Sequence, residues 1–537
     1  MNEFINNANK QSAKGLTQNG AKTFKSYHNA FVTDFSNATR YITPREYSDV
    51  DLTMSKLWSI NPETCLKLAM LFRLITRTVK YDNSVTDTTQ RGTGLKHEGA
   101  MRMYWIGVNH PKIFWDNIAL FIAMGSWYDL FQMLRWDLRN GWENRRLDWT
   151  KVIVLIKAGL ESDSKDLLLK FMPSIKSKKN SKGFERSERV KQNTIIGKYI
   201  ASKLCNSSYE MYRKLKSSGK GHEWQQYISR QEYDSINLKR VPGKALSMIL
   251  KSSFIEKSNA LQEQLLERLT QGLNSTEYAH DLYLLMKELE TRGTFIASKT
   301  PEIINSKMKT IIDKAKLGMN ANTRLMPVID TSGSMDSGDS KIPPIVYAKG
   351  LTVFLSHLFE GHFGKTFFEF NDGATFHDHR GLSPYQSFKR MQDICAYEST
   401  NFMSVIKELC KIRKTVDESE FPTGIVCLSD QEYNRPGPNK TNYKAAVKLL
   451  KEHFSPEFVK NFQFILWDLN STNANFQTYE DCENLFYLSG FDGSLIAFIT
   501  GIESTDKEGN KTIVKAESTD DTLEIALSQS IFDYVKI

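Results

Sequence analysis

The stretch Val328-Ile329-Asp330-Thr331-Ser332-Gly333-Ser334-Met335 decides the fold of this chain. An apolar, strand-like run from Leu325 to Ile329 ends there in the pattern Asp-x-Ser-x-Ser. One carboxylate and two hydroxyls therefore follow a strand, in a turn that a glycine relaxes. Open α/β sheets bind ligands at the carboxyl ends of their strands, and oxygen ligands suit a hard cation such as Mg²⁺. The pattern predicts a metal site with little negative charge, which can accept an anionic oxygen from a partner.

Two later segments supply the remaining candidate ligands. Thr400 lies in the loop Glu398 to Phe402, just before a predicted helix over Met403 to Ile412, and Asp430 ends the apolar run that begins at Gly424. Asp-x-Ser-x-Ser alone is also typical of a surface turn, but the later threonine and aspartate favour a metal site. The complete set resembles the metal-ion-dependent adhesion site of a von Willebrand factor A domain; its members are Asp330, Ser332, Ser334, Thr400 and Asp430. The resemblance implies that the hydroxyls hold the metal directly and the aspartates act largely through water.

Strands and helices alternate around these residues. We expect a helix over Pro344 to Leu358, a second strand over Lys365 to Phe370 and a third core strand over Asn461 to Trp467. A closing helix is expected over Leu523 to Tyr534. Alternation of this kind predicts a parallel sheet covered on both faces, in a doubly wound, Rossmann-like α/β domain.

Composition places the chain among ordinary globular proteins. Its 537 residues predict two to four domains, and 40% of them are hydrophobic and 25% charged. The most apolar stretch, Ile113 to Tyr128, contains Asp116 and is too short to cross a bilayer, so we expect no membrane contact. Met1 to Gln18 is polar, unlike a signal peptide, and the six cysteines lack metal-ligand spacing. We therefore expect a cytoplasmic, intracellular protein with reduced thiols.

The net charge of +9 conceals a division of the chain. Residues 1–320 carry 50 Lys+Arg against 32 Asp+Glu, giving +18, and residues 321–537 carry 21 against 30, giving −9. We predict a polar segment over 1–45, a basic helical domain over 46–320 and the A domain over 321–537. The basic domain indicates a polyanionic partner such as RNA, although a solvated basic surface without function explains the same charge.

The first 320 residues follow a helical pattern. Apolar residues recur at helical spacing in short segments, with no convincing run of alternating β-branched residues between them, so we expect a mostly helical region. Short helices joined by short loops pack as antiparallel pairs, which predicts an α-solenoid of HEAT-like repeats. The expected helices cover residues 62–79, 113–124, 127–138, 149–160, 192–204, 208–215, 244–250 and 261–269.

Two features of this half are candidates for RNA contact. The densest run of cations suits phosphate binding, or it is a solvated loop; it comprises Lys176, Lys178, Lys179, Lys182, Arg186, Arg189 and Lys191. A second basic cluster spans Arg213 to Lys220. Six of the nine tryptophans lie between Trp105 and Trp149. We expect most of them to be packing residues, with Trp142, in a polar loop, available to stack on bases.

A basic helical half followed by an A domain resembles the Ro autoantigen family, the TROVE–von Willebrand factor A proteins. It resembles more closely an uncharacterised family built on the same plan. The matching stretches are Arg91 to Gly94, Gly125 to Leu130, Phe171 to Pro173, Ile236 to Pro242, the Asp330 motif, Leu428 to Asp430, and Leu488 to Asp492. The resemblance implies a ring of helical repeats completed by the A domain, with structured RNA on the basic outer surface and single-stranded RNA ends in the hole.

Three functions follow from these patterns. The first is a non-enzymatic, Ro-like RNA-binding protein with a metal-binding A domain. The second is a metal-dependent protein scaffold without RNA binding, in which the ion captures a carboxylate of a partner protein. The third is an enzyme, but Ser332 stands where phosphoryl transfer needs a second carboxylate. The sequence around His377-Asp378-His379 predicts a polar loop rather than a catalytic base. We therefore expect no catalytic residues.

Overall fold

The computed structural model describes residues 9–41, 44–81, 84–85, 90–177, 185–218, 223–241, 246, 249, 252–270, 279–291, 294–316, 323–336, 342–396, 399–437, 440–469, 475–505 and 511–537. The chain divides into two compact units. The sheet unit combines Met1–Thr43 with Leu238–Ser528, and the helical unit combines Pro44–Asn237 with Gln529–Ile537. Over the described residues, every helix is too short or too polar to cross a membrane.

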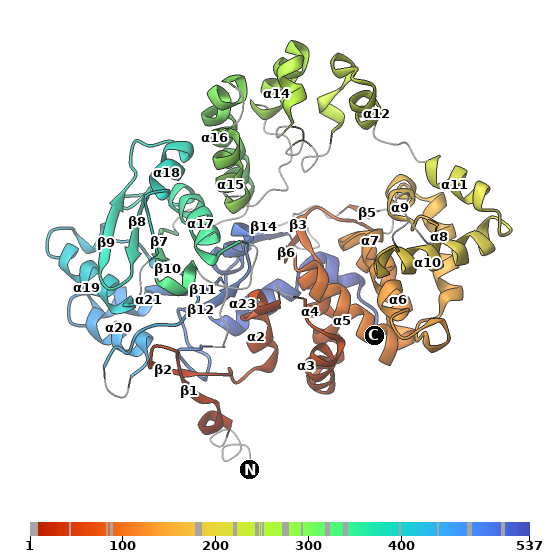
Figure 1. The fold of residues 1–537 in the computed structure, drawn as a ribbon. Coiled ribbons are helices and arrows are strands. Elements are labelled where there is room, and N and C mark those ends of the chain that lie inside the picture. Colours follow the sequence, from red (N-terminus) through yellow and green to blue (C-terminus); the bar gives the residue numbers. More distant parts are fainter. Residues whose placement is uncertain are drawn as a thin grey trace. The chain divides into compact units, whose positions relative to one another are not determined.

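A six-stranded sheet forms the centre of the sheet unit, in the order β12-β11-β10-β7-β8-β9 (Figure 1). Five strands run parallel, and β9 runs antiparallel at the edge. Every residue of β7, β10, β11 and β12 is buried, because both faces of the sheet are covered, and such strands are continuous apolar runs. The strands are β7 (Leu325–Asp330), β8 (Thr366–Phe370), β9 (Ala374–Asp378), β10 (Gly424–Ser429), β11 (Gln463–Asp468) and β12 (Leu485–Ser489).

Helices from several parts of the chain cover this sheet. The helix α17 (Pro344–Leu358) contacts β7, β8 and β10, and α15 packs on α17 in turn. The close approach depends on Gly350, because a Cβ there would lie 2.5 Å from the His280 backbone. The other helices of the unit are α2 (Ala30–Phe35), α14 (Asn259–Thr270), α15 (Ala279–Leu289), α16 (Thr294–Lys316), α18 (Pro384–Met391), α19 (Phe402–Ile412), α20 (Asn442–Leu450), α21 (Pro456–Asn461), α22 (Ala497–Thr500) and α23 (Thr519–Leu527).

The start of the chain packs on the sheet unit. The strands β1 (Lys14–Leu16) and β2 (Lys22–Phe24) pair antiparallel. Isolated bridges join Gly20 to Asn434 and Phe24 to Phe476, in the loops after β10 and before β12. The described part of the polar N-terminal segment thus packs within this unit. A further hairpin joins β13 (Ile502–Thr505) to β14 (Lys511–Val514).

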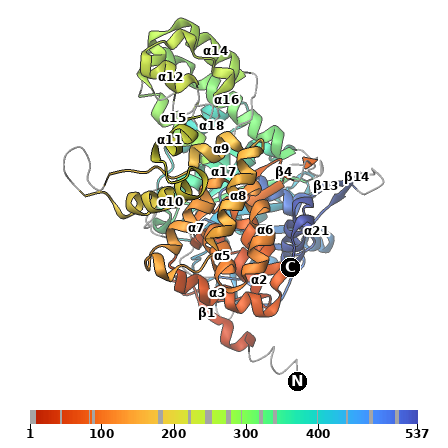
Figure 2. The same ribbon diagram turned by 90° about the vertical axis from the view of Figure 1, so that its right-hand side faces the viewer.

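The helical unit consists of helices that pack mostly on their neighbours in the chain. Figure 2 shows α5, α6 and α7 side by side, and each contacts the other two. The helices are α3 (Tyr47–Ile60), α4 (Pro62–Arg73), α5 (Lys96–Asn109), α6 (Pro111–Met124), α7 (Trp127–Asp137), α8 (Trp149–Glu161), α9 (Lys165–Phe171), α10 (Glu188–Leu204), α11 (Tyr209–Ser217) and α12 (Glu223–Arg230). The helical character expected of this region is confirmed, and the HEAT-like solenoid stays a prediction.

The predicted helix over 62–79 is wrong in its last turns. Helix α4 ends at Arg73, and β3 (Ile75–Arg77) then pairs with β6 (Gln90–Thr93). The run Ile75 to Val79 is rich in β-branched residues, which favour strands. The short strands β4 (Lys80–Tyr81) and β5 (Ser84–Val85) follow as a second pair, which the sequence pattern of this mostly helical half did not indicate. Most of the expected segment 244–250 lies outside the described residues.

Differences also occur towards the C-terminus. His377 and Asp378 belong to β9 rather than to a polar loop, because an exposed edge strand carries polar residues on its outer side. The closing helix stops at Leu527, and the residues after Ser528 belong to the helical unit. There the Gln529 side chain hydrogen-bonds both the backbone N–H and C=O of Arg91. Residues 238–316 belong to the same compact unit as the sheet, and the domain boundary at 320 stays a prediction.

A buried ion pair stabilises the helical unit and yields a testable prediction. Arg73 Nη2 lies 2.7 Å from Asp129 Oδ2, and both side chains are at most 3% exposed. Asp129 also accepts a hydrogen bond from the Ser126 backbone at the start of α7. Asp129→Ala leaves a buried, uncompensated guanidinium, so we expect the free energy of unfolding to fall by about 3–5 kcal/mol in urea denaturation. Asp129→Asn, which keeps one acceptor, should lose less. Equal stability of wild type and Asp129→Ala would contradict this account of the pair.

Two buried histidines and one half-buried histidine predict acid sensitivity of the sheet unit. Burial lowers the pKa of His280, His357 and His379 to about 4. Their pKa in the unfolded chain lies near 6.5, so unfolding takes up protons between pH 6.5 and 4. Above pH 6.5 the histidines are neutral in the folded and the unfolded chain, so they do not change the free energy of unfolding. Between pH 6.5 and 4 this free energy falls as pH drops, by up to about 1.4 kcal/mol per pH unit for each histidine. Urea midpoints at pH 7.5 and pH 5 measure the effect, and a higher midpoint at pH 5 would contradict it.

Candidate metal centre and basic surface

Two carboxylates meet at the carboxyl edge of the sheet. Asp330 is the last residue of β7, and Asp430 directly follows the neighbouring strand β10. Asp330 Oδ2 accepts a 2.5 Å hydrogen bond from Ser429 Oγ, and its Oδ1 accepts from the Ser332 backbone N–H at 2.8 Å. These bonds fix the Asp330 carboxylate at the point where the β7 strand turns away from the sheet.

The serine hydroxyls connect the two carboxylates. Ser332 Oγ and Ser334 Oγ lie 3.1 Å apart, and the Ser334 hydroxyl hydrogen-bonds the Asp430 side chain. Asp430 also accepts a hydrogen bond from the backbone N–H of Glu432. The structure therefore places four of the five predicted metal ligands in one hydrogen-bonded cluster.

Thr400, the fifth predicted ligand, lies at the same edge of the sheet. Its carbonyl accepts a hydrogen bond from the backbone of Asn434, just after the Asp430 loop. The next residue, Asn401, donates its N–H to the carbonyl of Asn371, one residue beyond β8. Within the described residues, no hydrogen bond joins the Thr400 hydroxyl to the other four side chains. The hydroxyl accepts instead from Asn19 Nδ2 at 3.3 Å.

The electrostatics of the cluster favour a cation. Asp330 and Asp430 are 0% and 5% exposed, and no salt bridge joins either to a cationic side chain of the described residues. Burial, followed by the charge of Asp430, raises the pKa of Asp330. Burial likewise raises the pKa of Asp430. Two desolvated carboxylates with three hydroxyls form an all-oxygen donor set, which fits a hard divalent ion. The described chain contains no metal-like cluster of three or more His, Cys, Asp or Glu, and three of the five candidates here are hydroxyls.

Sequence reasoning missed two residues beside this site. Glu432 is 3% exposed, and its carboxylate accepts hydrogen bonds from the Gln18 backbone and from Asn475 Nδ2. Gln431 adopts a φ of +65°, which is uncommon for a residue other than glycine. Among the residues that the structure describes, its buried amide has no hydrogen-bond partner. A Gln-Glu pair after a strand carries no motif, so only the positive φ and the burial single these residues out.

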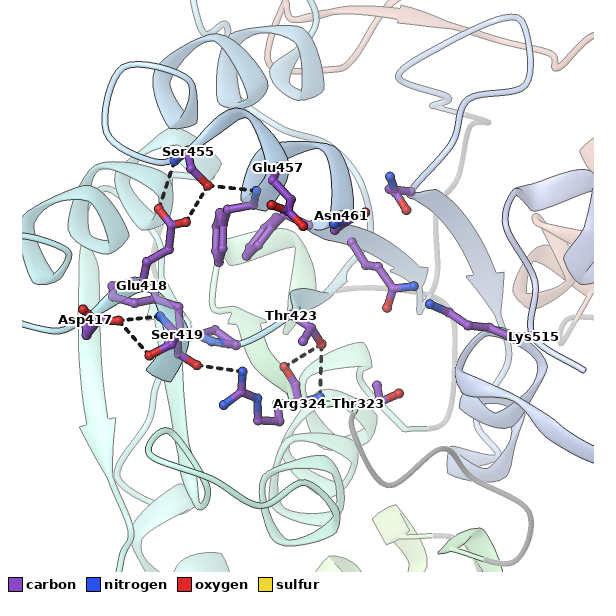
Figure 3. Close-up of a pocket in the computed structure, with 16 residues that line it drawn as sticks. Thr323, Arg324, Asp417, Glu418, Ser419, Thr423, Ser455, Glu457, Asn461 and Lys515 are labelled. Carbon is purple, nitrogen blue, oxygen red and sulfur yellow. Dashed lines mark hydrogen bonds between the residues drawn. The ribbon is translucent and has the colours of Figure 1, made fainter. Parts of the chain in front are cut away.

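A cavity of about 740 Å³ lies at the opposite, amino edge of the sheet (Figure 3). Its polar lining is largely paired with itself. The Glu418 carboxylate accepts from both the N–H and the hydroxyl of Ser455, and Arg324 donates to the Ser419 carbonyl. These groups do not converge on one point, and they lie at the ends of the strands away from the predicted ligands.

The predicted basic run is only partly within the described residues, because Lys178, Lys179 and Lys182 lie outside them. Lys176 is exposed, whereas Arg186 is half-buried. Arg189, at the start of α10, donates to Tyr128 Oη at 3.4 Å. Lys191 pairs with Glu185 at 3.0 Å.

Helix α11 extends this basic surface. Burial, followed by the charge of Lys176, lowers the pKa of Lys216, so these two cations lie close enough to repel one another. Arg213 on the same helix is exposed. Tyr209, which the sequence analysis did not single out, is 41% exposed and lies with its ring 5.9 Å from Lys198 Nζ. The helical unit carries 33 Lys+Arg against 22 Asp+Glu, or +11, and the sheet unit 38 against 40, or −2.

Trp142, the candidate for base stacking, is not a free stacking surface. It is half-buried, and the Arg145 guanidinium lies 3.3 Å from its ring centre. The ring also contacts Trp149 and Tyr199. The packing interpretation is confirmed for four tryptophans that are at most 5% exposed: Trp105, Trp127, Trp136 and Trp149.

Comparisons with known proteins place one family model on the sheet unit. Residues 324–532 match a model described as a domain of unknown function (DUF7788). No curated protein matches the chain. A solved Ro (RSR) protein of Deinococcus radiodurans is similar with 14% identity, covering 81% of this chain and 88% of that one, at a TM-score of 0.41. An aerotolerance-related membrane protein of Bacteroides fragilis is similar with 14% identity, over 40% of this chain and 88% of that one, at a TM-score of 0.21.

Proposed function

We propose that the protein is a non-enzymatic RNA-binding protein with a second, metal-dependent binding site. The helical unit binds RNA, and the carboxyl edge of the sheet holds Mg²⁺ or another divalent ion. The observation that carries the metal site is the hydrogen-bonded cluster of Asp330, Ser332, Ser334 and Asp430, in which neither buried carboxylate forms a salt bridge with a described residue.

In the metal site, Ser332, Ser334 and Thr400 would be the direct ligands, while Asp330 and Asp430 would hold the surrounding hydrogen bonds and balance the charge. When bound, the ion supplies positive charge to which a carboxylate of a partner protein can bind. Hydroxyl ligands are neutral, so they leave the ion more attractive to an anion than a set of carboxylates would.

The RNA site is supported by charge and by exposed side chains. Lys216 and Arg213 lie on α11, and Lys176 is close enough to Lys216 for its charge to lower the pKa of that lysine. Phosphate contacts of this type give affinity without reading sequence. Tyr209 offers a partly exposed ring beside Lys198, which suits stacking on a single-stranded base.

The second candidate function is a metal-dependent protein scaffold without RNA binding. The net charge of −2 on the sheet unit, which contains the metal site, favours a protein carboxylate over RNA as the ligand of that site. The two functions make separate predictions about chelation, because RNA binding through cations does not need the ion.

Binding of a labelled RNA with a hairpin and a single-stranded end tests the proposal. The full chain is titrated in low salt, once with Mg²⁺ and once with EDTA. We expect binding in both arms and a steep loss of affinity with added salt. Absence of binding at low salt would contradict RNA recognition and leave the scaffold function.

A further inference from the structure

A short segment near the N-terminus lies against the loop that follows β10. We name residues 17–21 the strap. Thr17 Oγ1 donates to the carbonyl of Tyr433 at 2.8 Å, and the Gln18 N–H donates to Glu432 Oε2 at 2.5 Å. The bridge between Gly20 and Asn434 continues the contact. The strap thus runs along residues 432–434, directly after the candidate ligand Asp430.

Asn19 connects the strap to a second candidate ligand. Its Nδ2 donates to the carbonyl of Glu432 at 2.5 Å and to Thr400 Oγ1 at 3.3 Å. A carbonyl oxygen only accepts, so the contact with Glu432 fixes which end of the Asn19 amide faces the loop. The Thr400 oxygen has two lone pairs, and the bond from Asn19 uses one of them. The other remains for a metal ion.

The strap also engages Glu432, the carboxylate nearest to Asp430 in the sequence. Glu432 Oε2 is held by Gln18 and Oε1 by Asn475 Nδ2. Both bonds direct this buried acid towards the strap and the 475 loop. The carbonyl of Glu432, held by Asn19, fixes the backbone two residues after Asp430.

We propose that the strap is part of the metal centre and that Asn19 is a positioning residue for the Thr400 hydroxyl. This inference rests on the proposed metal site. It adds to that site a segment from the N-terminal part of the chain. Hydrogen bonds that orient metal ligands strengthen metal binding. Because coupling between two binding events is reciprocal, the ion in turn stabilises the docked strap.

The strap has independent anchors, so loss of the Asn19 amide does not release the segment. Thr23 Oγ1 donates to the carbonyl of Phe476 at 2.8 Å, and Tyr27 Oη donates to Asp481 Oδ1 at 2.5 Å. His28 Nε2 pairs with Asp520 at 3.0 Å. Asn19 itself is exposed, and its truncation leaves no cavity in the core.

Calorimetric titration of Mg²⁺ into the full-length chain tests the proposal on three proteins: wild type, Asn19→Ala and Lys14→Ala. Lys14 is an exposed residue of the neighbouring strand β1 and is the matched control. We expect about a tenfold loss of Mg²⁺ affinity in Asn19→Ala, at the low end of such effects because Asn19 is exposed. We expect no loss in Lys14→Ala. Unfolding midpoints in EDTA should be equal, which separates positioning from a general loss of structure.

Hydrogen exchange of peptides covering residues 14–24 gives the second readout. We expect Mg²⁺ to slow exchange there in wild type and to do so less in Asn19→Ala. Equal affinities of wild type and Asn19→Ala, tighter binding by the variant, or exchange that does not respond to Mg²⁺ would each overturn the role of the strap. Absence of Mg²⁺ binding to wild type would instead overturn the metal site itself.

Discussion

Asp430→Asn is expected to abolish the stabilisation of the protein by Mg²⁺. Wild type should gain about 2.7 kcal/mol of unfolding free energy when Mg²⁺ is present at a hundred times its dissociation constant. The variant keeps the size of the side chain but removes one of the two buried charges that attract the ion. In EDTA, the variant should be as stable as wild type or more stable, because two buried carboxylates no longer repel one another. Urea denaturation with and without Mg²⁺ measures both effects.

The matched control is Asp372→Asn, an exposed carboxylate in the turn after β8. It removes the same charge from the same unit, and we expect it to keep the full response to Mg²⁺. If wild type gains no stability with Mg²⁺, or if Asp430→Asn gains as much as wild type, then the cluster is a hydrogen-bonded turn and not a metal site.

Neutralising three cations of the helical unit is expected to weaken RNA binding by about 100-fold or more at 0.1 M salt. The variant combines Lys176→Gln, Arg213→Gln and Lys216→Gln. Each lost phosphate contact lowers the slope of log affinity against log salt by about 0.7–0.9, so the slope should fall by about 2 to 3. Filter binding at several salt concentrations gives both the affinity and the slope.

The control for this variant removes the same number of charges elsewhere in the helical unit, from Lys56 on α3, Lys112 on α6 and Lys157 on α8. All three are exposed. We expect the control to lose much less affinity, because the repulsion between Lys176 and Lys216 marks one surface rather than the whole unit. Equal losses in the two variants would indicate diffuse attraction without a defined RNA site.

The sequence predicted the core of the sheet and the position of the motif well. The strands β7, β10 and β11 are continuous apolar runs. Asp330 is the last residue of β7 and Asp430 directly follows β10, so the meeting of these two aspartates at one edge depends only on local pattern and parallel pairing. The strand β9 was missed because its residues are mostly exposed and polar, as in a loop. The strand β3 was missed because the helical spacing of α4 continues past Arg73 in the sequence.

Other parts of the site depend on contacts that no local pattern contains. Asn19 and Thr400 are 381 positions apart, and their contact follows from how the N-terminal hairpin packs. The carboxylate of Glu432 is held by residues from two distant segments. The stacking of Arg145 on Trp142 likewise depends on the tertiary packing of the loop before α8, which turns a candidate base-stacking ring into a partly covered one.

Crystals of the full-length chain soaked in Mn²⁺ give the most direct test of the metal centre, because anomalous scattering locates the ion without any assay of function. The account predicts a single strong peak at the carboxyl edge of the sheet, about 2.0–2.6 Å from the hydroxyl oxygens of Ser332, Ser334 and Thr400. A map without a peak among these three oxygens, at a Mn²⁺ concentration that saturates the protein in solution, would contradict it.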